Sequence, residues 1–269
     1  MSSASFKTIS EFMKTKYGID LSAKEAVVEG RLTNMINQEG YDSYSDYFKC
    51  MMNDTTGQME EQLVNVLTTN HTYFMREFEH FEFLRDEILP YFKKKLENNR
   101  DLRIWCGAAS TGEEPYTIAM TVKQFLGLEG DSWDTKVLAT DISTEVLQTA
   151  IAGEYSAETI EKLSDSWKRR FFRKGKTPGT VSVSDELKNE VIFRQFNLMD
   201  EFPFKKEMHI VFLRNVMIYF DTPTRNRLVK KIYDSLAPGG YLIIGMTEAI
   251  DADAAPFEMV KPSIFRKPL

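Results

Sequence analysis

Residues 104–120, IWCGAASTGEEPYTIAM, constrain the fold of this chain more than any other stretch. An apolar run with the character of a strand leads into a turn between Gly107 and Gly112, and a helical pattern follows. A strand, a glycine-containing turn and a helix in this order place backbone N–H groups and a helix N-terminus around a ligand, and glycine permits its close approach. The stretch therefore predicts a ligand site at the carboxyl end of a strand in an α/β sheet.

The acids that follow this turn indicate what kind of ligand it holds. The turn lacks the G-x-G-x-x-G spacing of dinucleotide sites, and Glu113 and Glu114 at the helix start would repel a pyrophosphate. S-adenosylmethionine fits better, because its sulfonium and ammonium are positive and Glu114 could bind the ammonium. Alternatively, both glutamates only stabilise the helix dipole, and their spacing leaves the two interpretations open.

Strand-like and helical patterns alternate along the rest of this region. Four apolar runs have the length of strands: 102–106, 136–140, 210–214 and 241–245. Helical patterns lie near 114–125, 144–151 and 223–236. The alternation predicts an α/β fold with a parallel, doubly wound sheet. Short period-2 runs at 180–183 and 191–196 interrupt it, and we expect a small inserted antiparallel β-subdomain at about 169–196.

A different pattern occupies the first 67 residues. Apolar residues recur there at helical spacing, which predicts a small all-α domain over 1–67. Asp20 and Ser22 are suitable N-caps for its second helix, Gly40 for that helix's end, and Ser43 for the start of the third. We expect residues 68–98 to form a linker with a long helix, and residues 99–269 to form the sheet domain.

Polar residues follow three of the predicted strands. Asp141 follows VLAT at the sheet edge where an acid commonly accepts hydrogen bonds from ribose hydroxyls, although it could instead cap the next helix together with Ser143. Asn197 and Asn215 also end strand runs, where they could bind an adenine edge or a carboxylate. Taken singly, each asparagine is more often a turn former.

Charge and apolar content exclude several classes of protein. The net charge is −6, from 34 Lys and Arg against 40 Asp and Glu, so the surface would repel nucleic acid. No apolar run approaches the roughly 20 residues of a membrane span, and the first ten residues lack a signal-peptide core. Cys50 and Cys106 are far apart, which favours two buried free thiols. We expect a cytoplasmic protein that binds no nucleic acid and does not insert into a membrane.

Several motifs together resemble one family. AASTGEEPYTIAM, LATDIS, FNL and RNVMIYFD, in this order, resemble the chemotaxis receptor glutamate methyltransferase (CheR) family, and NHTYFMRE resembles its N-L-T-x-F-F-R-E segment. The resemblance extends from the N-terminal helices to the last strand. It implies a Rossmann-like S-adenosylmethionine-dependent methyltransferase domain, a small N-terminal all-α domain and an inserted antiparallel β-subdomain. These are the parts that the residue patterns predict.

The resemblance also implies an activity and a set of site residues. It implies methyl transfer from S-adenosylmethionine to glutamate side chains of bacterial chemoreceptors, giving methyl esters and S-adenosylhomocysteine, by a protein that we expect to be a monomer. The partners would be the cytoplasmic domains of methyl-accepting chemotaxis receptors. The cofactor contacts carried over by motif position are Asn70, Thr72, Arg76, Glu114, Asp141, Asn197, Leu198, Asn215 and Val216.

Arg76 and Tyr219 are the candidates for positioning the carboxylates, and neither assignment stands alone. Arg76 could instead pair with Glu77 or Glu79, and Tyr219 could be a core aromatic residue. A glutamate, with a solution pKa near 4.3, is already ionised at pH 7, so no general base is needed. The three histidines are too scattered for a metal site, and we expect no metal.

Other functions remain open at this point. The same fold could methylate another protein or a small molecule, or the chain could be a regulatory protein that binds S-adenosylmethionine without turnover. Two of the departures from the family pattern concern receptor recognition. The second helix offers only Arg31, with Lys24 upstream, where relatives have an arginine-rich stretch. The segment FFRKGKTPGTVSV is less glycine-rich than the version that binds a receptor pentapeptide in some relatives, which favours tether-independent action.

Overall fold

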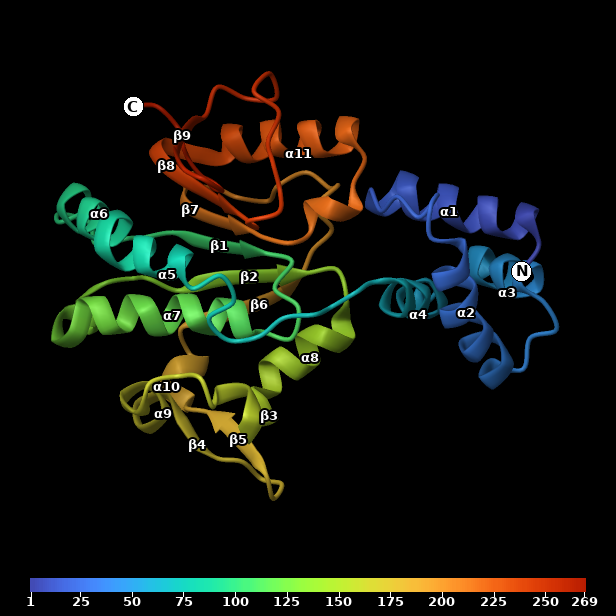
Figure 1. The fold of residues 1–269 in the computed structure, drawn as a ribbon, viewed down its shortest axis with the longest axis horizontal. Coiled ribbons are helices and arrows are strands. Elements are labelled where there is room, and N and C mark those ends of the chain that lie inside the picture. Colours follow the sequence, from blue (N-terminus) through green and yellow to red (C-terminus); the bar gives the residue numbers. More distant parts are fainter.

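Strand β1 (Ile104–Gly107) lies inside a seven-stranded sheet with the order β6-β2-β1-β7-β8-β10-β9. The computed structural model describes all 269 residues, and Figure 1 shows the sheet in the larger of two lobes. The first five strands of this order run parallel, and β10 and β9 are antiparallel to their neighbours. The other strands are β2 (Val137–Asp141), β6 (Val191–Gln195), β7 (Met208–Leu213), β8 (Leu236–Ile244), β9 (Glu258–Lys261) and β10 (Ile264–Arg266). The predicted α/β fold is confirmed as a mixed, mostly parallel sheet.

Helices cover both faces of this sheet. Side chains of a strand alternate between faces, so Ile104 and Cys106 join one core while Trp105 between them joins the other. One face packs against α7 (Glu113–Leu126) and the segment 79–95, and the other packs against α11 (Thr222–Ser235). Burial on both faces explains why the central strands read as continuous apolar runs.

The long helix after the linker contains a π-helical turn. The pattern over 78–96 predicts one helix, which the structure divides into α5 (Glu79–Phe83), a π turn (Leu84–Ile88) and α6 (Leu89–Lys95). Leu89 donates its N–H to the carbonyl of Leu84, five residues back. Pro90 follows directly and has no N–H to donate, so regular α-helical bonding cannot continue through it.

The smaller lobe is the predicted helical domain. Its helices are α1 (Ser3–Tyr17), α2 (Glu25–Glu39), α3 (Tyr44–Asn53) and α4 (Gln58–Leu67), around their own apolar core. Gly40 ends α2 with a φ of 76°, and the Ser43 hydroxyl caps α3, as expected. The expected cap of α2 is wrong: Lys24 precedes that helix with no side-chain cap, and Asp20 instead accepts a hydrogen bond from the Ser22 N–H in the preceding turn.

A three-stranded antiparallel sheet of order β3-β5-β4 extends from the larger lobe (Figure 1). Its strands are β3 (Glu154–Ser156), β4 (Phe172–Lys174) and β5 (Thr180–Val183), with α8 (Thr144–Ala152), α9 (Asp165–Phe171) and α10 (Asp185–Lys188) around it. The run 191–196 does not belong to this small sheet as expected. It forms β6, which pairs in parallel with β2 at the edge of the large sheet. A half-buried edge strand has the same period-2 pattern as a flap strand, so periodicity could not separate them.

One set of contacts between the two lobes joins α1 and the connector after it to the end of the loop after β7. Ile19 forms an isolated antiparallel bridge with Phe220, and Asp20 donates its N–H to the Tyr219 carbonyl at 2.8 Å. Lys14 of α1 pairs with Asp221 at 2.9 Å. The helical domain is thus attached directly to the segment that carries Tyr219.

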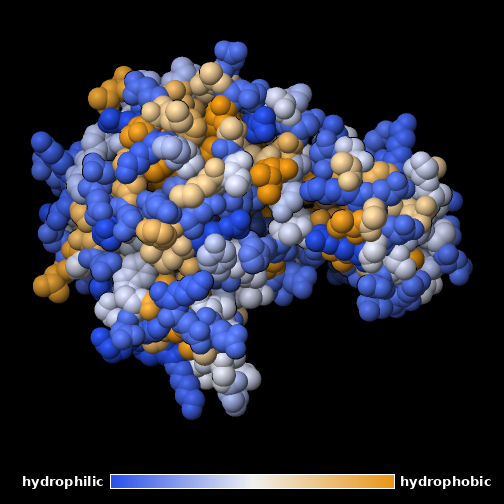
Figure 2. Space-filling view, in the orientation of Figure 1, coloured by the Kyte–Doolittle hydropathy of each residue, from blue (hydrophilic) through white to orange (hydrophobic).

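The surface of both lobes is largely hydrophilic in the view of Figure 2. Cys106 is buried as expected, but Cys50 is exposed, because α3 directs Tyr47 and Met51 into the core and position 50 falls on its outer face. None of the helices has both the length and the apolar character needed to cross a bilayer.

Candidate functional site

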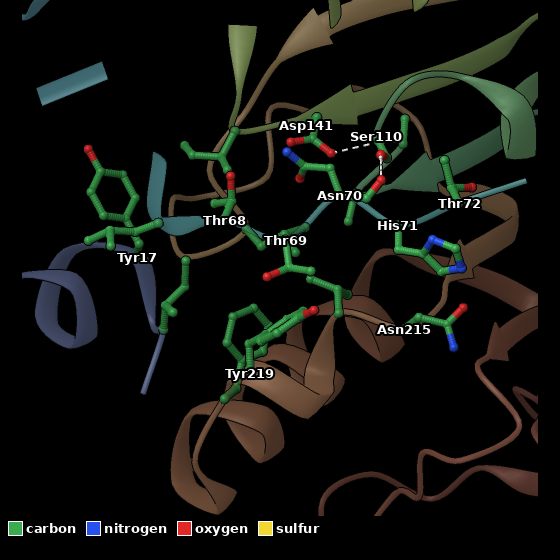
Figure 3. Close-up of a pocket in the computed structure, with 18 of the residues that line it drawn as sticks. Tyr17, Thr68, Thr69, Asn70, His71, Thr72, Ser110, Asp141, Asn215 and Tyr219 are labelled. Atoms are coloured by element: carbon green, nitrogen blue, oxygen red, sulfur yellow. Dashed lines mark hydrogen bonds between the residues drawn. The ribbon is translucent and has the colours of Figure 1, made fainter. Parts of the chain in front are cut away.

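One pocket lies where the carboxyl ends of β1, β2 and β7 meet the linker and the helical domain. Its wall from the helical domain includes Tyr17, Leu21, Lys24 and Arg31. All ten residues predicted from the sequence line it: Asn70, Thr72, Arg76, Glu114, Asp141, Asn197, Leu198, Asn215, Val216 and Tyr219. Figure 3 shows that Asn70, Asp141 and Ser110 lie together on one side of it and Tyr219 on another. Residues from five distant parts of the chain, together with the helical domain, therefore share one cavity.

The glycine turn bends sharply against this pocket. Ala108, Ser110 and Gly112 have φ values of 59°, 49° and 98°, in the left-handed region. A Cβ at Gly112 would lie 2.8 Å from the Cβ of Ala150, so only glycine fits there without displacing α8. Ser110 donates its hydroxyl to the Asn70 carbonyl at 2.8 Å, which ties the linker to the turn (Figure 3).

Asp141 ends β2 and is only 7% exposed. Its carboxylate accepts hydrogen bonds from the Ser110 N–H at 2.8 Å and the Ser143 N–H at 3.0 Å. Burial raises the pKa of this carboxyl above its ordinary value, and these N–H groups oppose the rise. Ser143, not Asp141, caps α8, by accepting from the Val146 N–H. Asp141 is therefore available to a ligand while the backbone holds its orientation.

Glu114 is engaged by a buried arginine that the sequence patterns did not single out. Arg214 has a side chain with no exposed surface, and it pairs with Glu114 at 2.5 Å and with Glu77 at 3.0 Å. The other Glu114 oxygen accepts a hydrogen bond from the Cys106 thiol at 3.3 Å. Glu113 is buried beside Thr111 and does not line the pocket. One of the two acids therefore faces the ligand site, and its charge is already partly balanced.

Arg76 faces the pocket without a carboxylate partner. Its guanidinium donates to the His71 carbonyl at 2.8 Å and lies 5.9 Å from the Tyr73 ring centroid. The alternative ion pairs with Glu77 or Glu79 do not form, since Glu77 pairs with Arg214 and no ion pair joins Arg76 to Glu79. The guanidinium is thus available for a ligand carboxylate.

Tyr219 lies where both of its sequence interpretations would place it. It packs against the core beneath α11 and also lines the pocket. Lys24 of the helical domain lies 4.6 Å from its ring centroid. The tyrosine therefore lies at the boundary between the two lobes.

The two asparagines also combine a structural and a site position. Asn197 accepts from the Met199 N–H at 3.0 Å, as a turn former does, and donates to the Lys16 carbonyl of α1 at 2.9 Å. Asn215 has a φ of 58° and donates its side-chain amide to Glu77 at 3.2 Å. Both still line the pocket, so neither interpretation excludes the other.

The histidines are more structural than the sequence suggested. His209 is buried and accepts from the Arg103 N–H at 3.0 Å. His80 is buried, hydrogen-bonded to Ser263 at 2.6 Å and 3.5 Å from the Glu77 carboxylate. Burial, assisted by the Arg214 charge, lowers the pKa of His80 to about 4.

His80 predicts how stability depends on pH. Because its folded pKa lies below the unfolded value, the unfolded chain binds the proton more readily between pH 6.5 and about 4. The contribution of neutral His80 to the free energy of unfolding is present above pH 6.5. It is lost as the pH falls towards 4, and the loss amounts to up to about 3 kcal/mol. Denaturant unfolding of His80→Gln should show a correspondingly smaller acid loss than the wild type. His71→Gln, at an exposed position, is the control, and an unchanged pH dependence in His80→Gln would contradict the assignment.

The chemistry of the lining fits an adenosyl amino acid. Apolar residues such as Ile142, Phe196 and Leu198 can contact a base, and Asp141 can accept from sugar hydroxyls. The guanidinium of Arg76, which has no carboxylate partner within the protein, suits an α-carboxylate. The donor set therefore matches S-adenosylmethionine, which the glycine turn alone could only suggest.

Comparisons with known proteins agree with this site. Residues 4–68 match the model of the CheR methyltransferase all-alpha domain, and residues 70–265 match the model of the CheR methyltransferase SAM binding domain. A chemotaxis protein methyltransferase of Borreliella burgdorferi is 38% identical over 93% of this chain and 89% of its own length. Chemotaxis protein methyltransferase 2 of Pseudomonas aeruginosa is 39% identical over 90% of this chain and 85% of its own. The Escherichia coli chemotaxis protein methyltransferase is 35% identical over 92% and 85%, respectively.

Proposed function

Because this chain belongs to the CheR methyltransferase family, we propose that it methylates glutamate side chains of bacterial chemoreceptors, giving methyl esters and S-adenosylhomocysteine. The observation that carries the proposal is the convergence of the ten motif residues on one pocket between the sheet and the helical domain. The chemotaxis methyltransferases similar over most of its length support the choice of receptors as substrates.

S-adenosylmethionine supplies, when bound, a methyl group on a positively charged sulfur. Asp141 accepts hydrogen bonds from the ribose hydroxyls, and Arg76 binds the carboxylate of the cofactor or of the incoming glutamate. The remaining contacts come from the linker, the glycine-turn helix and the loops after β6 and β7: Asn70, Thr72, Glu114, Asn197, Leu198, Asn215 and Val216. Glu114 orients the ammonium of the cofactor, and its ion pair with Arg214 holds the Glu114 carboxylate in place. The same ion pair reduces the negative charge that Glu114 presents to the pocket.

The acceptor needs alignment and not deprotonation. A glutamate is ionised at neutral pH, which agrees with a pocket where no histidine other than the exposed His71 is present. Tyr219 orients the incoming carboxylate, together with Arg76 if that guanidinium does not hold the cofactor's own carboxylate, and the wall from the helical domain excludes water from the pocket. A wall contributed by a separate domain favours a protein substrate over a small molecule.

The partners in this proposal are the cytoplasmic domains of methyl-accepting chemotaxis receptors, and the protein acts in the cytoplasm. The small sheet keeps the composition that favours action without a receptor tether, since Gly175 and Gly179 are the two glycines between β4 and β5.

Methyl transfer to receptor-containing membranes tests the proposal. Incubation with methyl-labelled S-adenosylmethionine should place alkali-labile label on the receptors. Receptors whose methylation-region glutamates are replaced by glutamine are the control, and they should stay unlabelled. Cofactor binding without label on any receptor would overturn the proposal in favour of a non-catalytic regulator, and label on other acceptors alone would indicate a different methyltransferase.

A further inference from the structure

Glu248, in the loop after β8, binds the backbone of the segment that follows β7, and it has no part in the mechanism proposed above. Its carboxylate accepts four backbone hydrogen bonds, and both oxygens take part. One oxygen accepts from Gly245 at 2.7 Å and Asn215 at 2.8 Å. The other accepts from Met217 at 2.7 Å and Ile218 at 3.3 Å. Glu248 itself does not line the pocket.

Three of these four donors belong to the segment 215–219, which follows β7 and ends in a short 3-10 helix (Met217–Tyr219). The first N–H groups of any helix have no partner within it, and this helix has no side-chain cap of its own. Glu248 supplies the missing acceptor from 30 residues away along the chain. It acts as an N-cap provided by the loop after β8.

The same segment contains left-handed backbone. Asn215 has a φ of 58°, a conformation that asparagine adopts more readily than most residues other than glycine, and its surroundings hold it there. Gly245 lies close against it, because a Cβ there would be 2.5 Å from the side-chain nitrogen Nδ2 of Asn215 and 3.0 Å from its backbone nitrogen. The hydrogen bond from the Asn215 N–H to Glu248 is therefore part of what keeps this residue facing the pocket.

We propose that Glu248 is a positioning residue for methyl transfer: it holds Asn215 and Val216 against the cofactor and Tyr219 against the acceptor. The inference rests on the proposed function of the pocket. A carboxylate is required because a glutamine offers one acceptor oxygen, and its NH₂ group would face two N–H donors. An aspartate keeps both oxygens but withdraws them by one methylene.

Glu248→Gln is the main test. Product binding reports on the cofactor side of the pocket, and kcat reports on methyl transfer to the acceptor. We expect S-adenosylhomocysteine to bind about tenfold more weakly by calorimetry, and kcat at saturating cofactor to fall by about tenfold to a hundredfold. Glu248→Asp should fall between Glu248→Gln and the wild type in both measurements. It also keeps the charge, so it serves if Glu248→Gln does not fold.

The matched control is Asp54→Asn. Asp54 also accepts backbone hydrogen bonds, from Thr56 at 2.8 Å and Met59 at 2.9 Å, but it lies in the helical domain outside the pocket. The Asp54→Asn variant should have a lower thermal midpoint, but its kcat and its affinity for S-adenosylhomocysteine should be unchanged. The proposal is wrong if Glu248→Gln keeps wild-type kcat and affinity, or if its losses match only the fraction that is unfolded. Because product binding is measured without receptor, this result stands even if no receptor is methylated.

Discussion

Replacement of Arg214 by methionine is expected to lower the free energy of unfolding by about 3 kcal/mol, because it leaves the carboxylates of Glu77 and Glu114, whose side chains are only 15% and 13% exposed, without their cation. Arg214 has no exposed side-chain surface, and its guanidinium pairs with Glu77 and Glu114 and donates to the Arg76 carbonyl at 2.5 Å. It also lies 5.3 Å from the Phe81 ring centroid. Arg214, directly after β7, therefore joins the end of that strand to both the linker and the glycine-turn helix.

Denaturant unfolding at neutral pH measures this loss. Arg85→Met is the control, since Arg85 pairs with Asp86 at the surface with 43% of its side chain exposed, and such pairs contribute about 0 to 1 kcal/mol. A loss as small as the control's would mean that water reaches the Arg214 site. Adding Glu77→Gln and Glu114→Gln to Arg214→Met should restore part of the stability, because the unpaired charges are then gone.

The sequence predicted the architecture wherever a local pattern carried the information. Ser43 and Gly40 mark helix ends through their own side chain and backbone, and both lie where expected. The alternation of apolar runs and helical patterns predicted the parallel core of the sheet, because each run is buried on both faces. The glycine turn and the polar residues after β2, β6 and β7 predicted the pocket, because carboxyl ends of parallel strands meet at one edge.

The choice of which strands pair with each other was not predictable from such patterns. The run at 191–196 could pair with β5 or with β2, and nothing in its residues distinguishes a flap strand from an edge strand. Strands β9 and β10 were not expected, because all four residues of β9 are exposed and β10, with three residues, is too short to give a period-2 signal.

The interactions that hold the site together were hidden for a related reason. Arg214 and Glu114 are 100 residues apart in sequence, and Glu248 and Met217 are 31 apart. A charged residue at the end of an apolar run, as Arg214 is in HIVFLR, gives no local sign of the carboxylates that it will meet. The resemblance to a family carried over residues that line the pocket, and it left out Arg214 and Glu248, which hydrogen-bond to some of them.

Arg76→Ala is expected to reduce methyl transfer by about a hundredfold while the protein stays folded. The only hydrogen bond that its guanidinium makes within the protein is to the His71 carbonyl, so truncation should move the thermal midpoint by no more than about 2 °C. Radiolabel transfer and thermal unfolding, measured on one preparation, check the two halves of this expectation. Arg227→Ala, at an exposed arginine whose guanidinium contacts Thr224, is the control and should retain full activity.

The same variant decides which carboxylate Arg76 binds. If it holds the cofactor's carboxylate, Arg76→Ala should weaken S-adenosylhomocysteine binding and raise the KM for S-adenosylmethionine, with much of kcat recovered at saturation. If it holds the incoming glutamate, product affinity should stay unchanged and kcat should remain low. Arg76→Lys keeps the charge but lacks the planar fork, so a two-point contact predicts little rescue. Wild-type turnover in Arg76→Ala would contradict both roles, because the guanidinium faces the pocket with no carboxylate of the protein to explain its position.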